Sequence, residues 1–329
     1  MTASILAVDI EVWPLAQPFV IARGAKTEAR VVVVTVADGP HRGRGEAVPY
    51  ARYGETPEAT RQALLAAATA DAATLAATLP PGAARNALDC ALWDLDAKRS
   101  GIPAAVRAAA MVPWAIPPAP IVTAYTLSLA APDAMAVAAR AARSLPLLKL
   151  KLGGGAIDGE RMRAVRAARP DARLIADANE AWTLAETPAL LSEAAACGFE
   201  TVEQPLPAEA DAALAGMDRP LPVTADESVH VSTDLERLAG RYDAVNIKLD
   251  KAGGLTEALR LATAARERGL DIMVGSMVAT SLAVAPALLL AGVARWVDLD
   301  GPLLLAADRP DGLAIADGIV APASRRLWG

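Results

Sequence analysis

The sequence predicts an α/β protein in which a parallel β/α barrel follows a smaller α+β region. The chain has 329 residues, enough for a barrel and an accessory domain. From about residue 120 onward, short apolar strands alternate with alanine-rich helical stretches, which is typical of a parallel sheet. Hydrophobic residues make up 53% of the chain but aromatic residues only 4%, so alanine, leucine and valine must fill the core.

Residues 1–118 are predicted to form the α+β region. The elements expected there are strands at Ile5–Pro14 and Ala29–Val36, a loop at Val48–Thr56, and helices at Pro57–Ala77 and Ala83–Lys98. The polar segment between the two strands, Ala22–Glu28, is predicted to be flexible. The proline-rich run Val112–Pro120 predicts the boundary with a barrel domain over residues 119–319.

Eight strands are predicted in the rest of the chain. They are Ile121–Leu129, Leu147–Leu152, Arg173–Asn179, Thr201–Leu206, Pro222–Ser228, Ala244–Asp250, Asp271–Met277 and Arg295–Asp300. Helices expected between them include Pro132–Ser144, Gly159–Ala168, Pro188–Cys197 and Thr256–Arg268. Eight strands at this spacing favour a closed barrel over an open doubly wound sheet. The run Gly153–Gly155 lacks the spacing of a dinucleotide-binding fingerprint.

Composition and charge argue against several classes of function. The formal net charge is −6 with no basic stripe, so no nucleic-acid partner is expected. The longest apolar stretch, Leu282–Ala294, is shorter than the roughly 20 residues of a membrane-spanning helix, and residues 1–10 do not resemble a signal peptide. Cys90 and Cys197 lie in apolar surroundings, as expected for reduced thiols in a cytoplasmic protein. With two histidines, histidine-based catalysis or a multi-histidine zinc site is not expected.

Charged residues interrupt the apolar strands near their C-terminal ends, where a β/α barrel carries its active site. Asp177, Glu203 and Asp226 lie at the ends of the third, fourth and fifth strands. If they point inward, these carboxylates repel one another unless a cation binds them, and all-oxygen ligation favours Mg²⁺ or Mn²⁺ over zinc. Each motif alone is more often a turn or a helix cap. Their joint occurrence at successive strand ends favours a metal site.

Lysines lie on the strands that flank this predicted metal site. Lys149 and Lys151 are two residues apart on the second strand and therefore point the same way, while Lys248 ends the sixth strand across the barrel. A lone Lys-x-Lys is usually a solvated strand edge. Here, cationic neighbours and burial would depress the pKa of a lysine and make it a usable base. We expect one lysine to remove the proton beside a substrate carboxylate, giving an enediolate, and the other to deliver a proton to the opposite face.

As a set, these motifs resemble those of the enolase superfamily, in the branch of the muconate-lactonising enzymes and the dipeptide epimerases. The resemblance covers nearly the whole chain. It implies a modified (β/α)₇β TIM-type barrel with an α+β capping domain that residues 320–329 complete. It also implies that the three carboxylates bind one Mg²⁺ per subunit. Lys151 and Lys248 would be the two bases, and Lys149 would lower the pKa of Lys151 and hold the substrate carboxylate.

The same resemblance implies a substrate site. Asp298 and Asp300, after the last barrel strand, would bind an α-ammonium group, which needs the charge and hydrogen bonds of two carboxylates. Arg23, in the loop Ile-Ala-Arg-Gly, would bind a glutamate side chain, because a guanidinium fork matches a carboxylate. Lys26 or Arg30 could take that role instead.

Residues with smaller expected roles complete the predicted site. Thr126 on the first barrel strand and Ser276 at the end of the seventh are candidates for backbone contacts to a dipeptide, although a hydroxyl there is often only a local hydrogen bond. Tyr50, Arg52 and Tyr53 in the second capping loop are expected to help exclude water.

The resemblance therefore implies a Mg²⁺-dependent epimerase that interconverts L-Ala-D-Glu and L-Ala-L-Glu by two-lysine 1,1-proton transfer, in the recycling of murein peptides in the cytoplasm. A homo-oligomer is expected, since dimers and octamers both occur in the superfamily. An epimerase of another dipeptide would make no use of Arg23. A cycloisomerase or o-succinylbenzoate synthase would not need Asp298 and Asp300. The non-enzymatic alternative is a catalytically silent barrel that acts as a scaffold.

Overall fold

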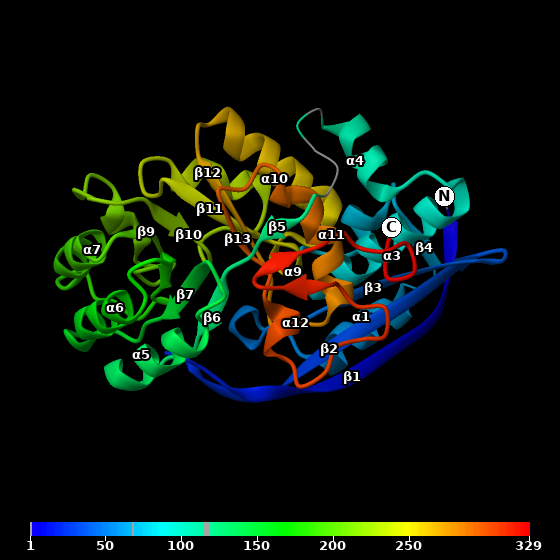
Figure 1. Cartoon of the computed structure of the whole chain (residues 1–329). Coiled ribbons are helices and arrows are strands. Elements are labelled where there is room, and N and C mark those ends of the chain that lie inside the picture. Colours follow the sequence, from blue (N-terminus) through cyan, green and yellow to red (C-terminus); the bar gives the residue numbers. More distant parts are fainter. Residues whose placement is uncertain (1, 68, 113, 115–118) are drawn as a thin grey trace.

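The computed structural model describes residues 2–67, 69–112, 114 and 119–329, and it shows an antiparallel capping region beside a β/α barrel (Figure 1). The barrel strands are β6 (Tyr125–Leu127), β7 (Leu147–Lys151), β8 (Arg173–Asp177), β9 (Phe199–Glu203), β10 (Val223–Ala225), β11 (Ala244–Lys248), β12 (Asp271–Gly275) and β13 (Trp296–Asp298). These eight strands pair in sequence order, and each pair is parallel. Hydrogen bonds from Ala124 N to Val297 O (2.7 Å) and from Leu299 N to Thr123 Oγ1 (2.8 Å) link the two edges. The predicted fold class, a nearly closed barrel with a capping region, is confirmed.

Helices surround the barrel strands. They are α5 (Pro132–Ala141), α6 (Ile157–Ala168), α7 (Thr187–Ala196), α8 (Leu235–Leu238), α9 (Leu249–Ala252), α10 (Leu255–Glu267), α11 (Ser281–Ala291) and α12 (Gly301–Leu304), with 3₁₀ turns η2 (Asp211–Leu214) and η3 (Ser232–Asp234). The four predicted barrel helices correspond to α5, α6, α7 and α10. Strands β7 and β11 are buried at every position, and mainly alanine, leucine and valine pack around them. Within the described part of the chain, no helix is both long and apolar enough to cross a membrane.

The capping region combines an antiparallel sheet with helices. Its elements are β1 (Thr2–Ile21), β2 (Gly24–Asp38), β3 (His41–Ala47), η1 (Ala51–Tyr53), α1 (Pro57–Ala66), β4 (Thr69–Asp71), α2 (Leu75–Thr78), α3 (Ala83–Ser100) and α4 (Ala104–Met111). The sheet order is β3-β2-β1-β4. Helix α3 lies so close to β3 that a Cβ at Gly45 would come within 2.0 Å of Ala87 O. Only glycine therefore fits at that position.

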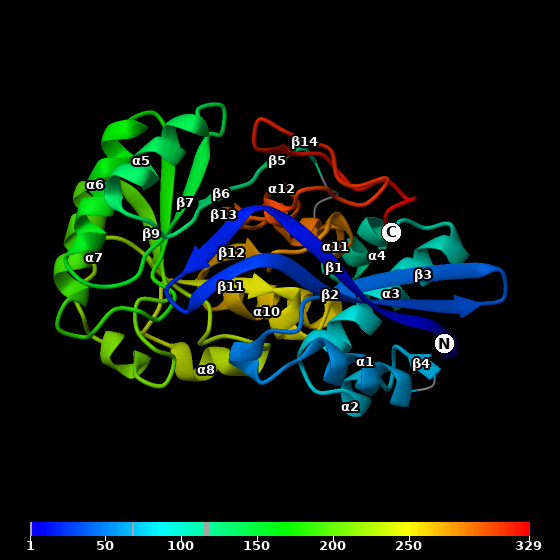
Figure 2. The ribbon, with the colours of Figure 1, turned by 90° about the horizontal axis from the view of Figure 1, so that it is seen from below.

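The prediction of a flexible segment at Ala22–Glu28 is wrong. A two-residue turn joins β1 to β2, and the register begins at Ile21 and Gly24. The first five residues of β2 are all exposed, so the segment lacks the apolar alternation that marks a half-buried strand. The resulting hairpin extends from the capping region to the barrel, where Leu129 N donates to Val20 O at 2.9 Å (Figure 2).

Two other predicted elements are divided in the structure. The single helix predicted at Pro57–Ala77 is wrong, because α1 ends at Ala66 and residues 69–71 add strand β4 to β1. The strand predicted at Ile121–Leu129 is interrupted: β5 (Ile121–Val122) leaves the barrel and pairs with β15 (Ile319–Val320), which also pairs with β14 (Ile315–Ala316). In both cases pairing with a distant strand overrides the local preference of the sequence.

The chain terminus packs against helix α3. Trp328 Nε1 donates to Cys90 O at 2.9 Å, and Gly329 N donates to Asp94 Oδ1 at 2.8 Å. These contacts attach the end of the chain to the capping region, as expected if residues 320–329 complete a capping domain. The domain limits at 118 and 319 stay a prediction, and the proline-rich run Val112–Pro120 lies largely outside the described residues.

A buried ion-pair network joins the C-terminal segment to the capping sheet. Arg309 Nη2 lies 2.7 Å from Glu46 Oε2 and 2.6 Å from Glu11 Oε2, and Arg309 Nε donates to Thr280 Oγ1 at 2.6 Å. Glu46 is 1% exposed, and burial raises the pKa of its carboxyl despite the charge of Arg309. Removing Arg309 would leave this buried carboxylate without its cation.

We therefore expect Arg309→Met to lower the free energy of unfolding by about 3–5 kcal/mol. Arg30→Met is the matched control, because Arg30 pairs with Glu58 at 2.7 Å on the exposed surface and should contribute under about 1 kcal/mol. Urea unfolding of both variants measures the difference. Equal losses would show that the network does not stabilise the fold.

Candidate active site

A cavity of about 430 Å³ lies at the C-terminal ends of the barrel strands, under the β1–β2 hairpin. Its lining comes from the barrel and from both capping loops. The predicted site residues in the lining are Arg23, its alternative Lys26, Tyr50, Arg52, Tyr53, Thr126, Lys149, Lys151, Asp226, Lys248, Ser276, Asp298 and Asp300. The two loops and the strand ends that sequence reasoning singled out therefore meet at one place.

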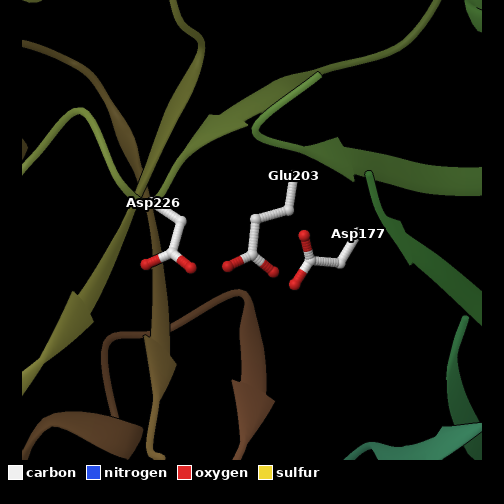
Figure 3. Close-up of side chains that lie close together, drawn as sticks. All are labelled: Asp177, Glu203 and Asp226. Carbon is white, nitrogen blue, oxygen red and sulfur yellow. The ribbon is translucent and has the colours of Figure 1, made fainter. Parts of the chain in front are cut away.

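Three carboxylates converge beneath this cavity, with Glu203 between Asp177 and Asp226 (Figure 3). Asp177 ends β8, Glu203 ends β9, and Asp226 follows β10. All three are buried, and one oxygen from each lies within 4.8 Å of the others. Burial and the charge of Asp177 raise the pKa of Glu203 to about 8. Hard, closely spaced oxygen donors fit a divalent cation such as Mg²⁺.

The two outer carboxylates of this cluster each contact a lysine. Lys151 Nζ lies 2.5 Å from Asp177 Oδ2, and Lys248 Nζ lies 2.5 Å from Asp226 Oδ2. The two lysines thus approach the cluster from different ends, one from β7 and one from β11. This places an amine on either side of the cavity floor, which is the arrangement that two-base proton transfer needs.

Lys149 occupies the centre of the cluster. Its Nζ lies 2.5 Å from Glu203 Oε2, 2.6 Å from Asp298 Oδ2 and 3.3 Å from Asp177 Oδ2, and the residue is 1% exposed. As the spacing predicts, Lys149 and Lys151 point the same way, and both contact Asp177. Lys149 therefore connects the three-carboxylate cluster to the Asp-x-Asp pair.

The expectation of depressed lysine pKa values is wrong for Lys149 and Lys248 in this structure. Burial alone would lower both values, but facing carboxylates outweigh it. Asp298 and Glu203 hold the pKa of Lys149 well above its ordinary range, and Asp226 and Glu203 raise that of Lys248. These carboxylate charges must be neutralised before either lysine can act as a base.

Asp298 and Asp300 lie together on one side of the cavity. Asp300 Oδ2 accepts a hydrogen bond from Thr126 N at 2.6 Å, and burial together with the charge of Asp298 raises the pKa of Asp300 to about 7. Ser276 N donates to Asp298 O at 3.0 Å. The buried Asp298 Oδ1 and Ser276 Oγ have no hydrogen-bond partner among the residues that the structure describes. Unpaired buried acceptors beside the cavity are suited to a ligand that donates hydrogen bonds.

Arg23 connects the hairpin turn to the barrel loops. Its Nη1 donates to Asn179 O at 2.8 Å and lies 3.2 Å from Glu180 Oε2, while its Nη2 lies 2.7 Å from Glu227 Oε1. Asn179 and Glu180 adopt positive φ values of 47° and 68°, so the chain turns directly after β8 and presents both groups to the hairpin. Arg52 joins the same network through Glu180 at 2.9 Å.

Sequence reasoning assigned no role to two residues that contact the carboxylate cluster. Asn246 Nδ2 donates to Glu203 Oε1 at 2.6 Å. Lys251 is 1% exposed, and its Nζ lies 2.5 Å from Asp226 Oδ1 and 3.0 Å from Asn246 O. Asn246 could have been found, because it lies two residues before Lys248 on β11 and therefore shares its face. Lys251 lies in helix α9, whose orientation no strand periodicity reveals.

An eight-stranded barrel with a capping region, three carboxylates on successive strand ends and lysines on both sides of them defines an enzyme of the enolase superfamily. Residues 133–325 match the family model described as enolase C-terminal domain-like, and residues 4–106 match the N-terminal domain of mandelate racemase/muconate lactonizing enzymes. The chain belongs to this mandelate racemase/muconate lactonizing enzyme family.

Characterised relatives are similar along nearly the whole chain. The chain is 45% identical over 315 residues to L-Ala-D/L-Glu epimerase of Escherichia coli (strain K12), covering 94% of this chain and 96% of that protein. It is 44% identical over 306 residues to N-acetyl-D-glutamate racemase of Pseudoalteromonas sp, covering 91% and 95%. The predicted class, an isomerase of the racemase and epimerase kind acting on amino-acid derivatives, is confirmed by these relatives.

A solved structure from Agrobacterium tumefaciens shows the same fold. That enolase family member, described as homologous to dipeptide epimerases, superposes with a TM-score of 0.94 at 48% identity, covering 99% of both chains. Its crystals contained bound sodium and L-Ala-L-Glu, with an ordered loop.

Proposed function

We propose that the protein is a dipeptide epimerase that inverts Cα of the C-terminal residue in L-Ala-D-Glu and L-Ala-L-Glu. The observation that carries this proposal is the position of Lys151 and Lys248 at opposite ends of a buried carboxylate cluster, beside the Asp298/Asp300 pair. The substrate named for the Escherichia coli relative and the dipeptide bound in the Agrobacterium structure support it. The proposal includes a role in murein peptide recycling, a cytoplasmic setting and a homo-oligomeric state.

Asp177, Glu203 and Asp226 would hold one Mg²⁺, and Asn246 would orient Glu203 through its hydrogen bond. When bound, this cation would neutralise the carboxylates that raise the lysine pKa values and would attract the negative charge that develops on the substrate carboxylate. This donor set consists of oxygen atoms only, which suits Mg²⁺ and not zinc.

The lysines would carry out the proton transfers. Lys151 would exchange a proton with one face of the substrate α-carbon, and Lys248 would exchange a proton with the opposite face. In each direction one lysine starts neutral and the other starts protonated, so a completed inversion leaves the pair in the reverse state. Lys149 would hold the substrate carboxylate by its charge.

Asp298 and Asp300 would bind the α-ammonium of the N-terminal alanine. Asp298 Oδ1 is buried without a hydrogen-bond donor in the described part of the chain, and Asp300 is held in place by the Thr126 amide. An ammonium group supplies hydrogen-bond donors for Asp298 Oδ1 and a positive charge beside Asp300. Ser276 Oγ, also without a partner among the described groups, would contact the dipeptide backbone.

The second candidate function is racemisation of N-acetylglutamate, the substrate named for the Pseudoalteromonas relative at 44% identity. That substrate has no ammonium group, so it would leave the buried Asp298 Oδ1 without a hydrogen-bond donor among the described groups. The dipeptide proposal uses the Asp298/Asp300 carboxylates, whereas the N-acetylglutamate proposal does not.

The test is α-proton exchange in deuterated water with Mg²⁺, followed by NMR, on L-Ala-D-Glu, N-acetyl-L-Ala-D-Glu and N-acetyl-D-glutamate. We expect deuterium to enter the glutamate α-position of L-Ala-D-Glu with inversion. The two acetylated compounds should react at least about 10²-fold more slowly, because a buried charge pair is lost. Faster exchange in N-acetyl-D-glutamate would favour the racemase, and no exchange in any of the three would contradict both candidates.

A further inference from the structure

One buried amide side chain connects two of the strand ends that carry the carboxylates of the proposed cation site. Gln204 directly follows Glu203 and is fully buried. Its Oε1 accepts hydrogen bonds from the backbone N of Asp226 at 2.8 Å and from that of Ser228 at 3.2 Å. Its own backbone N donates to Thr224 O at 2.9 Å. Gln204 therefore determines how far the chain that carries Asp226 lies from the end of β9.

The same residue is bonded to the loop after β8, the strand that ends in Asp177. Gln204 O accepts a hydrogen bond from Glu180 N at 2.9 Å. Gln204 also adopts a positive φ of 36°, in a region that residues with a Cβ populate sparsely. Such a backbone conformation persists only where the surrounding structure holds it in place. The three strand ends that carry the carboxylates thus meet at one residue, whose own conformation depends on its neighbours.

A buried hydroxyl network holds the other end of the Gln204 amide. Its Nε2 donates to Leu206 O at 2.9 Å, Ser228 Oγ at 2.8 Å and Tyr242 Oη at 2.9 Å. The two hydroxyl oxygens lie 3.0 Å apart, and Tyr242 Oη donates to Asp211 Oδ2 at 3.1 Å. Hydrogen bonds are strong in the low-dielectric interior, and a connected set of them makes its members rigid. This network therefore keeps the Gln204 amide from turning away from the two backbone N–H groups that it accepts from.

Fixed spacing of the carboxylates bears on which cation the site would accept. Mg²⁺ requires nearly ideal octahedral geometry with oxygens at about 2.1 Å, whereas Ca²⁺ accepts longer distances and irregular geometry. A rigid set of ligands closes around the smaller cation at little cost, and a loosened set loses this advantage. The residues that would contribute ligand atoms are Asp177, Glu203 and Asp226. Gln204 would act on the cation only through the positions of these three.

We propose that Gln204 is a positioning residue that fixes the spacing of the three carboxylates, that Tyr242 holds Gln204 in place, and that the site thereby prefers Mg²⁺ to Ca²⁺. The inference rests on the cation site of the proposed function and extends it to two residues outside the ligand set. Gln204 and Tyr242 act through geometry, because replacing Gln204 by Met or Tyr242 by Phe leaves the charge of the site unchanged.

The experiment measures the Kd of Mg²⁺ and of Ca²⁺ by isothermal titration calorimetry, on the whole chain after a chelator has removed divalent cations. The proteins compared are the wild type, Gln204→Met, Tyr242→Phe and the control Thr201→Val. Gln204→Met removes the acceptor of two backbone N–H groups and should weaken Mg²⁺ binding by about 10- to 100-fold, with a smaller loss for Ca²⁺. Tyr242→Phe leaves both bonds to Gln204 Oε1 in place and should weaken Mg²⁺ binding by about threefold to tenfold.

Thr201→Val is the matched control for the loss of a buried hydrogen bond between β9 and β10. Thr201 Oγ1 lies 2.7 Å from Thr224 Oγ1, two residues before Glu203, so this variant should be less stable but keep the wild-type Kd for Mg²⁺.

An unchanged Mg²⁺ Kd in Gln204→Met, or an equal loss of affinity in Thr201→Val, would overturn the inference while the cation site stands. If Gln204→Met does not fold, Tyr242→Phe decides, and an unchanged Mg²⁺ Kd there overturns the inference. A wild type that binds neither cation would overturn the proposed cation site and this inference with it.

Discussion

Lys248→Met should lower epimerisation of L-Ala-D-Glu and L-Ala-L-Glu by about 10²–10⁴-fold in both directions. Inversion needs a base on each face of the α-carbon, and this variant leaves only Lys151. Exchange without inversion should survive for the one isomer whose α-proton faces Lys151, because a single lysine can remove a proton and return deuterium to the same face. Lys151→Met should show the complementary pattern with the other isomer. NMR in deuterated water measures exchange, and polarimetry measures inversion.

Lys248→Arg is the matched control for charge. A guanidinium keeps the positive charge beside Asp226 but does not lose its proton in proteins, so it preserves the electrostatics without the base. We expect this variant to be as defective in inversion as Lys248→Met. Recovery of inversion in Lys248→Arg would mean that Lys248 acts only through its charge, and exchange of both isomers in Lys248→Met would remove it from proton transfer.

The carboxylates and lysines at the bottom of the cavity could be predicted, because in a barrel the position of a residue along its strand determines where it lies. All strands of a parallel barrel end at the same rim, so charges that interrupt apolar strands at their ends must meet. Asp177, Glu203 and Asp226 meet for this reason, within 4.8 Å. The two-residue repeat of strands also predicts correctly that Lys149 and Lys151 share a face.

The β1–β2 hairpin, which lies over the cavity, could not be predicted in the same way. At the tip of the β1–β2 hairpin, residues Gly24–Glu28 of β2 are all exposed, so no apolar periodicity marks this part of the strand. The partners of Arg23 come from Glu180 and Glu227, more than a hundred residues away. The sequence pointed to Arg23 as a ligand for substrate, but only the folded chain shows which carboxylates it already contacts.

The prediction for the helix at Pro57–Ala77 failed for a related reason. Its alanine-rich composition favours a helix throughout, but residues 69–71 pair with the first residues of β1. The pairing partner lies at the other end of the region, so local propensity could not reveal the interruption. Long-range pairing likewise removes β5 from the barrel and attaches it to the C-terminal strands.

Removal of divalent cations should abolish turnover, and Mg²⁺ should restore it. Stripping the metal would matter little to a silent scaffold, so this result separates the enzyme from the non-enzymatic alternative. Glu203→Gln should prevent the restoration, because one of three carboxylate ligands becomes a neutral amide. Glu200→Gln is the matched control on the same strand, since Glu200 pairs with Arg173 at 2.7 Å outside the carboxylate cluster.

Unfolding provides a measure of the cation that does not depend on turnover. Mg²⁺ at a hundredfold excess over its Kd should stabilise the wild type and Glu200→Gln by about 2.7 kcal/mol, because only the folded chain brings the ligands together. Mg²⁺ should stabilise the Glu203→Gln variant by a much smaller free energy. Equal stabilisation of all three proteins would place the cation elsewhere. Lost turnover in Glu203→Gln with full stabilisation would mean that Glu203 acts in catalysis without holding the metal.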